Sequence, residues 1–110
     1  MKLKICGILD INILQHACEA NVDFVGFIMA NNSPRKISND FLDSLKNFNF
    51  LDTVPVFVFV NPSVEEVEKV TTKIENPILQ FHGDEGDNFC KQFNLPFWKT
   101  IRVKNFKSLN

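Results

Sequence analysis

Short, almost continuous apolar runs recur along this chain, and they constrain its fold more than any other feature of the sequence. The clearest run is Val-Phe-Val-Phe-Val at residues 56–60, directly after Pro55. A strand with one solvated face alternates apolar and polar residues, whereas a strand that is covered on both faces is apolar throughout. β-branched and aromatic residues also favour strands. The run therefore predicts an inner strand of a parallel sheet.

Segments with helical spacing of apolar residues alternate with these runs. We expect five strands, over Lys2–Cys6, Asp23–Met29, Pro55–Val60, Pro77–His82 and Phe97–Val103. Consecutive parallel strands joined by right-handed helical crossovers either close into a barrel or form an open, doubly wound sheet, and the periodicity leaves both architectures open. No linker rich in Pro, Gly or Ser interrupts the chain, and 110 residues suffice for one core, so we expect a single domain over residues 1–110.

Capping residues mark where four helices should begin. Asp10 and Ser38 are typical N-caps, and Ser63 with Glu66 three residues later fits a capping box. Asp84 is expected to cap the fourth helix. The apolar stripes that these helices would bury are Ile11, Leu14, Ala17 and Cys18 in the first, Phe41, Leu42, Leu45 and Phe48 in the second, Val67, Val70 and Ile74 in the third, and Phe89, Cys90 and Phe93 in the fourth.

Composition and short motifs argue against several classes of protein. A net charge of −1 with only two arginines leaves no basic surface for nucleic acid. No run of about 18 apolar residues is present and Met1 leads directly into a strand pattern, so we expect no membrane span, no signal peptide and a cytoplasmic location. Three cysteines without a CxxC pair are expected to be reduced thiols and not metal ligands. The nucleotide-binding fingerprints GxGxxG and GxxxxGK(S/T) are absent, and we expect no cofactor.

Reactive and polar side chains follow the predicted strands. Cys6 ends the first apolar run, Arg35 lies in the loop after the second, Asn61 follows the third and His82 follows the fourth. Because the carboxyl ends of parallel strands face the same way, we expect these four side chains along one rim, where α/β enzymes hold their active sites. Each also has an ordinary structural interpretation. Cys6 could be a small buried hydrophobe and Arg35 a solvated loop cation. His82 could be a hydrogen-bonded imidazole at a strand end, and Asn61 a turn residue.

Four ordered motifs carry a resemblance to a known family. They are Lys4-Ile5-Cys6-Gly7, then Asp23–Ile28 leading to Ser33-Pro34-Arg35, then Val58–Ser63, and finally Gln80–Glu85. Together they resemble phosphoribosylanthranilate isomerase, over the whole of the chain. The resemblance implies an α/β fold of the (βα)8 TIM-barrel type, of which this chain looks like the N-terminal half. The expected fold is then a partial barrel of about five parallel strands and four helices.

The resemblance also implies an activity and a set of site residues. The family catalyses the Amadori rearrangement of N-(5-phosphoribosyl)anthranilate to 1-(o-carboxyphenylamino)-1-deoxyribulose 5-phosphate in tryptophan biosynthesis, without a cofactor. Cys6 matches the general base, and a thiolate is chemically competent for that task. Arg35 matches the position that holds the anthranilate carboxylate, for which a planar guanidinium is well suited. Gly7, Gln80 and His82 match positions that line the substrate pocket.

Two parts of the family's site have no match in this sequence. The resemblance implies a general acid, an Asp after the sixth strand, and phosphate-binding loops after the seventh and eighth strands. We therefore expect the chain alone to be inactive or nearly so, and to associate through open sheet edges with a C-terminal partner fragment or with itself. Two alternatives stay open: a non-catalytic half-barrel that serves as an assembly subunit, and another phosphosugar-binding βα protein.

Overall fold

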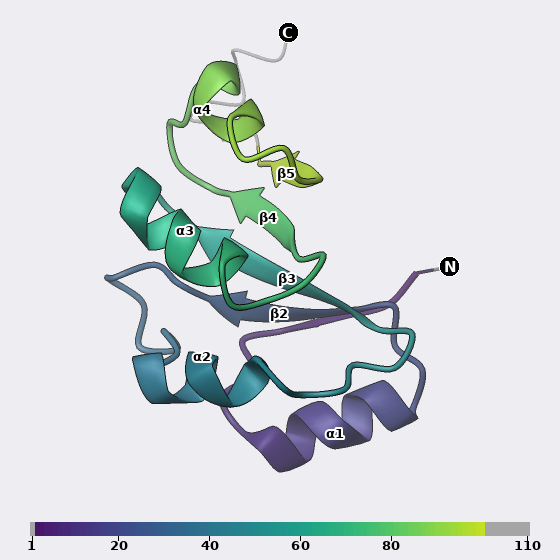
Figure 1. The fold of residues 1–110 in the computed structure, drawn as a ribbon. Coiled ribbons are helices and arrows are strands. Elements are labelled where there is room, and N and C mark those ends of the chain that lie inside the picture. The colour runs from purple at the N-terminus through teal and green to yellow at the C-terminus, as the bar shows by residue number, and fades with distance from the viewer. Residues whose placement is uncertain (1, 101–110) are drawn as a thin grey trace, which may run out of the picture.

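Strands and helices alternate along the chain in the computed structural model, which describes residues 2–100 (Figure 1). The elements are β1 (Lys4–Cys6), α1 (Ile11–Glu19), β2 (Phe24–Ile28), α2 (Asn39–Leu45), β3 (Val54–Phe59), α3 (Val64–Thr71), β4 (Ile78–Phe81), α4 (Asp87–Lys91) and β5 (Phe97–Lys99). The predicted order of strands and helices is therefore confirmed.

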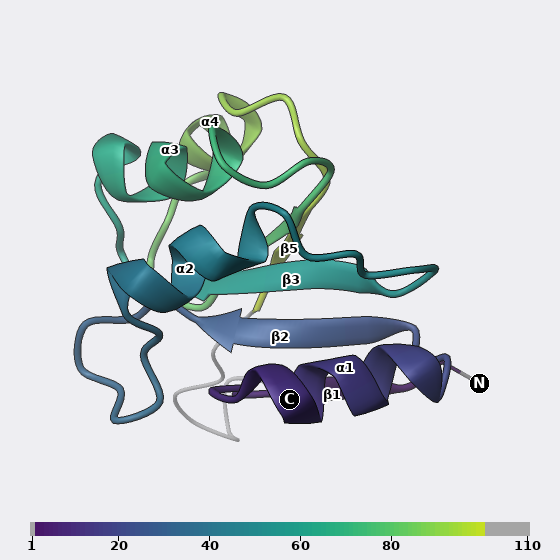
Figure 2. The same ribbon diagram turned by 60° about the horizontal axis from the view of Figure 1, so that its bottom comes forward.

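The order of the strands decides between the two architectures that the periodicity left open. The sheet has the order β1-β2-β3-β4-β5, and every neighbouring pair is parallel. A doubly wound sheet would place β1 inside the sheet, with helices on both faces. Figure 2 instead shows α1 and α2 on the same side of β1, β2 and β3. The prediction of a partial barrel is confirmed.

One hydrophobic core joins the helices to the outer face of this sheet. Side chains alternate between the two faces of a strand, and Val25, Phe27, Phe57, Phe59 and Phe81 are buried against the helices. Phe27 stacks on Phe57 with ring centroids 5.2 Å apart, and Phe59 stacks on Phe81 at 5.9 Å. The helices supply the other side of the core through buried residues of the predicted stripes: Leu14, Ala17, Cys18, Leu42, Leu45, Val67, Val70, Ile74 and Cys90.

The inner face of the sheet is concave. Two contacts cross it over three strand spacings: Lys4 Nζ of β1 lies 2.6 Å from Gln80 Oε1 of β4, and the rings of Phe24 in β2 and Trp98 in β5 are 5.0 Å apart. Neighbouring strands are about 4.8 Å apart, so in a flat sheet each pair of strands would be about 14 Å apart. Both contacts form because the sheet curves around this face, as a segment of a barrel does.

Three of the four predicted helix caps are present. Asp10 Oδ1 accepts from the amide two residues later at 2.7 Å, and Ser38 Oγ accepts from the amide three residues later at 3.1 Å. Ser63 and Glu66 form the predicted capping box. The longest helix, α1, has nine residues, and among residues 2–100 no helix is long and apolar enough to cross a membrane.

The prediction that Asp84 caps α4 is wrong. The N-cap of α4 is Gly86, which offers no side-chain hydrogen bond. The backbone N–H of Asp84 instead donates to Asn61 Oδ1 at 2.8 Å. Asp84 therefore belongs to a loop that is tied to the end of β3, and the helix begins three residues later, at Asp87.

The strand ends differ from the predicted ends by one or two residues. β1 begins at Lys4 and not at Lys2, because the N–H of Leu3 donates to the side chain of Asp23 at 2.7 Å and not to a neighbouring strand. The predicted end of the last strand, Val103, lies outside the described residues.

Candidate active site at the carboxyl ends of the strands

The thiol of Cys6 lies at the carboxyl end of β1 and is exposed. Cys6 is the last residue of the strand, and it pairs with Gly26 of β2 in the parallel register. A Cβ atom on residue 26 would lie 2.9 Å from Cys6 Sγ, so the thiol packs directly over this glycine. Because side chains on a strand alternate, Lys4 lies on the same face, and the same Cβ would lie 3.1 Å from Lys4 Cε.

The other two cysteines are buried and belong to the core. Cys18 on α1 and Cys90 on α4 are at most 1% exposed, and all three thiols are free. Burial raises the pKa of the Cys18 thiol and of the Cys90 thiol, because a thiolate loses its hydration in the core. Of the three thiols, only that of Cys6 is open to a ligand.

Arg35 reaches the same end of β1 from the loop after β2. That loop folds back along its own strand: the Ile37 N–H donates to Ile28 O at 3.0 Å, and the Arg35 N–H donates to Ser33 Oγ at 3.1 Å. Gly7 has a φ of 81°, and a Cβ atom on it would lie 3.1 Å from Arg35 Cδ and 3.2 Å from Nη1. The guanidinium therefore packs over the residue that follows Cys6.

The guanidinium is available for an anionic ligand. Arg35 is exposed, and among residues 2–100 no carboxylate lies within ion-pairing distance of it. The left-handed conformation of Gly7 suits glycine, and the absence of a side chain there leaves room for the guanidinium. The thiol thus belongs to Cys6, and the guanidinium packs over the next residue, Gly7.

Gln80 and His82 lie at the end of β4 and share the inner face. Gln80 Nε2 and His82 Nε2 are 2.8 Å apart, and the His82 backbone N–H donates to Phe59 O at 2.9 Å. Gln80 Oε1 accepts from Lys4 Nζ, which links this pair to β1. The sequence analysis did not single out Lys4. A lysine two residues before Cys6, and therefore on the same face of the predicted strand, was the available signal.

Asn61 serves to join two loops at this rim. Its φ is 46°, its N–H donates to Glu85 Oε2 at 2.8 Å, and its Oδ1 accepts from Asp84. Glu85 is only 7% exposed, and its second oxygen, Oε1, has no hydrogen-bond partner among the described residues. Asn61 is therefore a turn residue held by its neighbours. Glu85, which sequence reasoning did not single out, is the buried acceptor that holds it.

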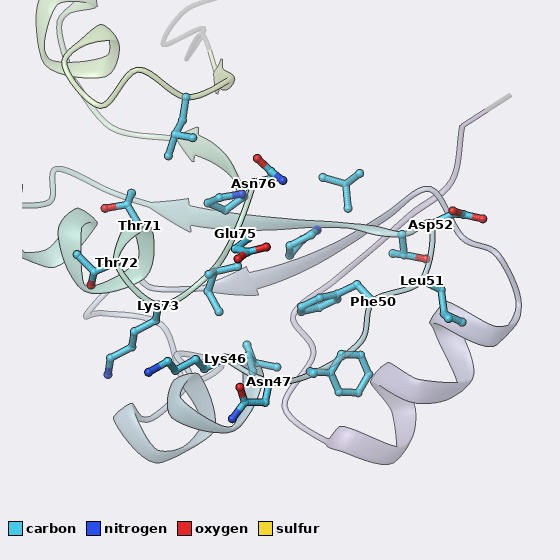
Figure 3. Close-up of a pocket in the computed structure, with 18 residues that line it drawn as sticks. Lys46, Asn47, Phe50, Leu51, Asp52, Thr71, Thr72, Lys73, Glu75 and Asn76 are labelled. Atoms are coloured by element: carbon cyan, nitrogen blue, oxygen red, sulfur yellow. The ribbon is translucent and has the colours of Figure 1, made fainter.

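A hollow outside the rim lies at the opposite end of the strands. It has a volume of about 820 Å³ and lies between the loop from α2 to β3 and the loop from α3 to β4 (Figure 3). Lys46, Phe50, Lys73 and Asn76 are among its lining residues, which include no cysteine, histidine or arginine. In open α/β sheets and in barrels, sites lie at the carboxyl ends of strands. We therefore place the candidate site at the Cys6 rim and not in this hollow.

Nothing in the site's chemistry points to a metal centre. Within the described part of the chain, no group of three or more His, Cys, Asp or Glu side chains is placed to hold a metal ion. The arrangement at the rim offers instead a proton acceptor in Cys6 and a planar cation in Arg35. Such a pair can bind a carboxylate and move a proton next to it.

Comparisons with known proteins agree with this geometry. Residues 3–110 match the family model of N-(5'-phosphoribosyl)anthranilate (PRA) isomerase. The N-(5'-phosphoribosyl)anthranilate isomerase of Xanthomonas euvesicatoria pv. vesicatoria is 37% identical over 100 residues, which are 91% of this chain and 45% of that protein. The enzyme of the same name from Bacillus mycoides is 37% identical over 103 residues, 94% of this chain and 50% of that protein. The chain thus spans about half the length of the curated relatives it matches.

Solved structures show the same likeness. Phosphoribosyl anthranilate isomerase from Thermotoga maritima superposes with a TM-score of 0.85 at 26% identity, over 99% of this chain and 54% of that chain. A phosphoribosyl anthranilate isomerase in complex with reduced 1-(o-carboxyphenylamino)-1-deoxyribulose 5-phosphate gives the same TM-score and identity, over 99% of this chain and 57% of that chain. With its partial barrel, its rim of Cys6 and Arg35 and a family match from residue 3 to residue 110, the chain belongs to the N-(5'-phosphoribosyl)anthranilate isomerase family.

Proposed function

We propose that this chain supplies the proton-transfer and carboxylate-binding part of a phosphoribosylanthranilate isomerase site that acts in tryptophan biosynthesis. The observation that supports the proposal is that the Cys6 thiol packs over Gly26 while the Arg35 guanidinium packs over Gly7, the residue that follows Cys6. The substrate would be N-(5'-phosphoribosyl)anthranilate, a small molecule with a carboxylate at one end and a phosphate at the other. The reaction needs no cofactor.

The chemistry assigns one step to each of these two side chains. Protonation of the ribose ring oxygen breaks the C1′–O bond and leaves an iminium ion. The Cys6 thiolate then takes the C2′ proton, and the electrons of the C–H bond form the enamine, which tautomerises to the ketone. Arg35 binds the anthranilate carboxylate with two parallel N–H donors, which holds C2′ near the thiolate. Exposure of the Cys6 thiol is consistent with this task.

Three further residues complete the proposed pocket on this half of the barrel. Gly7 leaves space beside the guanidinium, and Gln80 and His82 line the inner face at the end of β4. In the family pattern, the general acid follows a sixth strand and the phosphate loops follow a seventh and an eighth. The described residues form five strands. The proposed site therefore needs those later strands for full activity.

The partner in this proposal is a polypeptide segment that completes the barrel. Among residues 2–100, β1 and β5 form the two edges of the sheet. Leu3 and Ile5, at the β1 edge, are 55% and 36% exposed, and unpaired strand edges with apolar side chains favour association. A second copy of this chain is the other occupant that the edges would accept. In this proposal, residues 1–110 form a single domain and the protein acts in the cytoplasm.

The test is a steady-state isomerase assay on the chain with and without a fragment that carries strands six to eight. The chain alone should turn over far below about 1 s⁻¹, and the fragment should restore measurable isomerisation. Cys6→Ala should lower the restored rate by about 10² to 10⁴, the usual contribution of a general base. Cys18→Ala, in the core, is the matched control and should leave the chemical step unchanged. Equal rates for the wild-type and Cys6→Ala complexes would remove Cys6 from the mechanism.

A further inference from the structure

The side chain of Lys4 crosses the inner face of the sheet to reach the end of β4. Its Nζ lies 2.6 Å from Gln80 Oε1 and 5.5 Å from the centroid of the Trp98 ring. It passes over Gly26, where an added Cβ atom would lie 3.1 Å from Lys4 Cε. The half-buried Lys4 ammonium is thus held by a hydrogen bond to Gln80 and by the face of the Trp98 ring. Gly26 leaves room for the lysine chain to cross β2, because it has no side chain.

This contact fixes which way the Gln80 amide points. A lysine ammonium has three donors and no acceptor, so only the carbonyl oxygen of Gln80 can face it. The amide nitrogen must then face the other way, where it lies 2.8 Å from His82 Nε2 and 3.5 Å from Thr100 Oγ1. If the amide were reversed, its NH₂ group would face the Lys4 ammonium, and both groups can only donate. The orientation therefore follows from the chemistry of Lys4.

The orientation of the amide in turn decides the state of the His82 ring. The Gln80 amide nitrogen can only donate, so His82 Nε2 must accept, and a ring nitrogen that accepts carries no proton. The neutral ring then has its proton on Nδ1. We propose that Lys4 and Gln80 are positioning residues that hold His82 as the neutral Nδ1–H tautomer at the rim. Any consequence for catalysis rests on the proposed function, but the tautomer itself does not.

The consequence for the proposed site is one of charge and of donor placement. The rim already carries the guanidinium of Arg35 and the ammonium of Lys4. A neutral His82 adds no third cation, and its ring proton lies on Nδ1. Lys4, on the β1 edge of the sheet, thus sets the hydrogen-bonding capacity of His82 through Gln80, which lies 76 residues after Lys4 in the sequence.

The test reads the tautomer directly. Long-range ¹H–¹⁵N correlation spectra of the chain, labelled with ¹⁵N in its histidines, distinguish a ring nitrogen that carries a proton from one that does not. At about pH 8.5 an ordinary imidazole is neutral. The chain has two histidines, and the exposed His16 on α1 serves as the internal reference. Wild-type His82 should give the Nδ1–H pattern.

Substitutions of the two positioning residues should change this pattern in different ways. Lys4→Met frees the amide to rotate and should give a mixture of tautomers, whereas Lys4→Arg, which also only donates, should keep Nδ1–H. Gln80→Glu places an acceptor opposite Nε2 and should move the proton of His82 to Nε2. Lys2→Met is the matched control, because the Lys2 ammonium lies over the Phe24 ring and forms no hydrogen bond with Gln80, and should change nothing.

Each result counts for or against the proposal. An Nε2–H pattern in the wild type, or an unmixed Nδ1–H pattern in Lys4→Met, would overturn it. Spectra of the same labelled chain with the unlabelled barrel-completing fragment give a second measurement, which covers variants that fold only in the complex. In the isomerase assay of that complex, Lys4→Met should lower kcat/KM by about ten- to a hundredfold, and Lys4→Arg should restore kcat/KM.

The two proposals can fail separately. An Nδ1–H ring together with unchanged activity in Cys6→Ala would contradict the proposed function and leave the positioning network intact. Activity that depends on Cys6 together with an Nε2–H ring would contradict the positioning network alone.

Discussion

The Sγ atom of Cys6 lies so close to Gly26 that a Cβ atom on residue 26 would be 2.9 Å away from it. The two residues are register partners, the last residue of β1 and the middle residue of β2. Real Cβ atoms do not approach a heavy atom so closely. The position of the only exposed thiol in the chain is therefore set by the absence of a side chain on the neighbouring strand.

Gly26→Ala should disturb the thiol and destabilise the protein. The new methyl group would also lie 3.3 Å from the Cα atom of Cys6, which cannot move without a shift of β1. Insertion of a methyl group into such a contact costs about 1–3 kcal/mol of unfolding free energy. Urea denaturation measures the loss. Gly86→Ser is the control, because a Cβ there meets nothing within 4 Å and serine is a favourable N-cap, and it should cost less than about 0.5 kcal/mol.

The three cysteines should differ sharply in their reaction with alkylating reagents. Under native conditions at neutral pH, Cys6 should react readily, while Cys18 and Cys90 should react only when the chain unfolds, because both are buried and their thiol pKa values are raised. Mass spectrometry after a short pulse of iodoacetamide counts the modified thiols. One modified site is expected in the wild type and none in Cys6→Ala. Fast labelling of Cys18 in the native chain would contradict the described core.

The raised pKa values of the buried thiols also predict a loss of stability at high pH. The folded state keeps the Cys18 and Cys90 protons to a higher pH than the unfolded chain, for which the reference value is 9.0. Their contribution is therefore fully present below about pH 9 and is lost as the pH rises through the folded pKa values. Urea midpoints at several values between pH 7 and pH 11 measure this fall. The Cys18→Ala, Cys90→Ala double variant should show a shallower fall over the same range.

Glu85 should stabilise the rim through a single hydrogen bond to the backbone of Asn61. Glu85→Ala removes the acceptor of the Asn61 N–H and should cost about 0.5–1.5 kcal/mol, whereas Glu85→Gln keeps a carbonyl acceptor and should cost less. Asp84→Ala is the control, since Asp84 contributes its backbone N–H, which the substitution retains. Urea denaturation ranks the three variants, and an Asp84→Ala loss as large as that of Glu85→Ala would contradict this assignment.

Arg35→Lys should separate binding from chemistry in the assembled site. A lysine keeps the positive charge but cannot form two parallel hydrogen bonds with a carboxylate. If Arg35 binds the anthranilate carboxylate as proposed, KM should rise about tenfold or more, with a smaller change in kcat. Lys36→Met, next in the chain, is the control, because the Lys36 ammonium donates to Asn31 and makes no contact with Gly7. An unchanged KM would assign Arg35 to the solvated surface of the loop.

Much of the fold follows from local physical chemistry that can be read along the chain. The unbroken Val-Phe-Val-Phe-Val run requires cover on both faces, and Asp10, Ser38 and Ser63 accept the first amides of three helices where the spacing predicts. These are interactions within a few residues, so no knowledge of distant neighbours is needed. Asp84 was misassigned because the partner of its N–H, Asn61, lies 23 residues away in the sequence.

The sequence alone determined that Cys6 ends a strand, that Arg35 and His82 follow strands, and that parallel strands would bring all three to one end of a sheet. Only the tertiary structure decided that the strands run in the order β1 to β5 and that the sheet curves. Curvature depends on strand twist and on packing between residues far apart in the chain, which no local pattern encodes. It is this curvature that brings Lys4 to Gln80, and so joins β1 to β4 through one hydrogen bond.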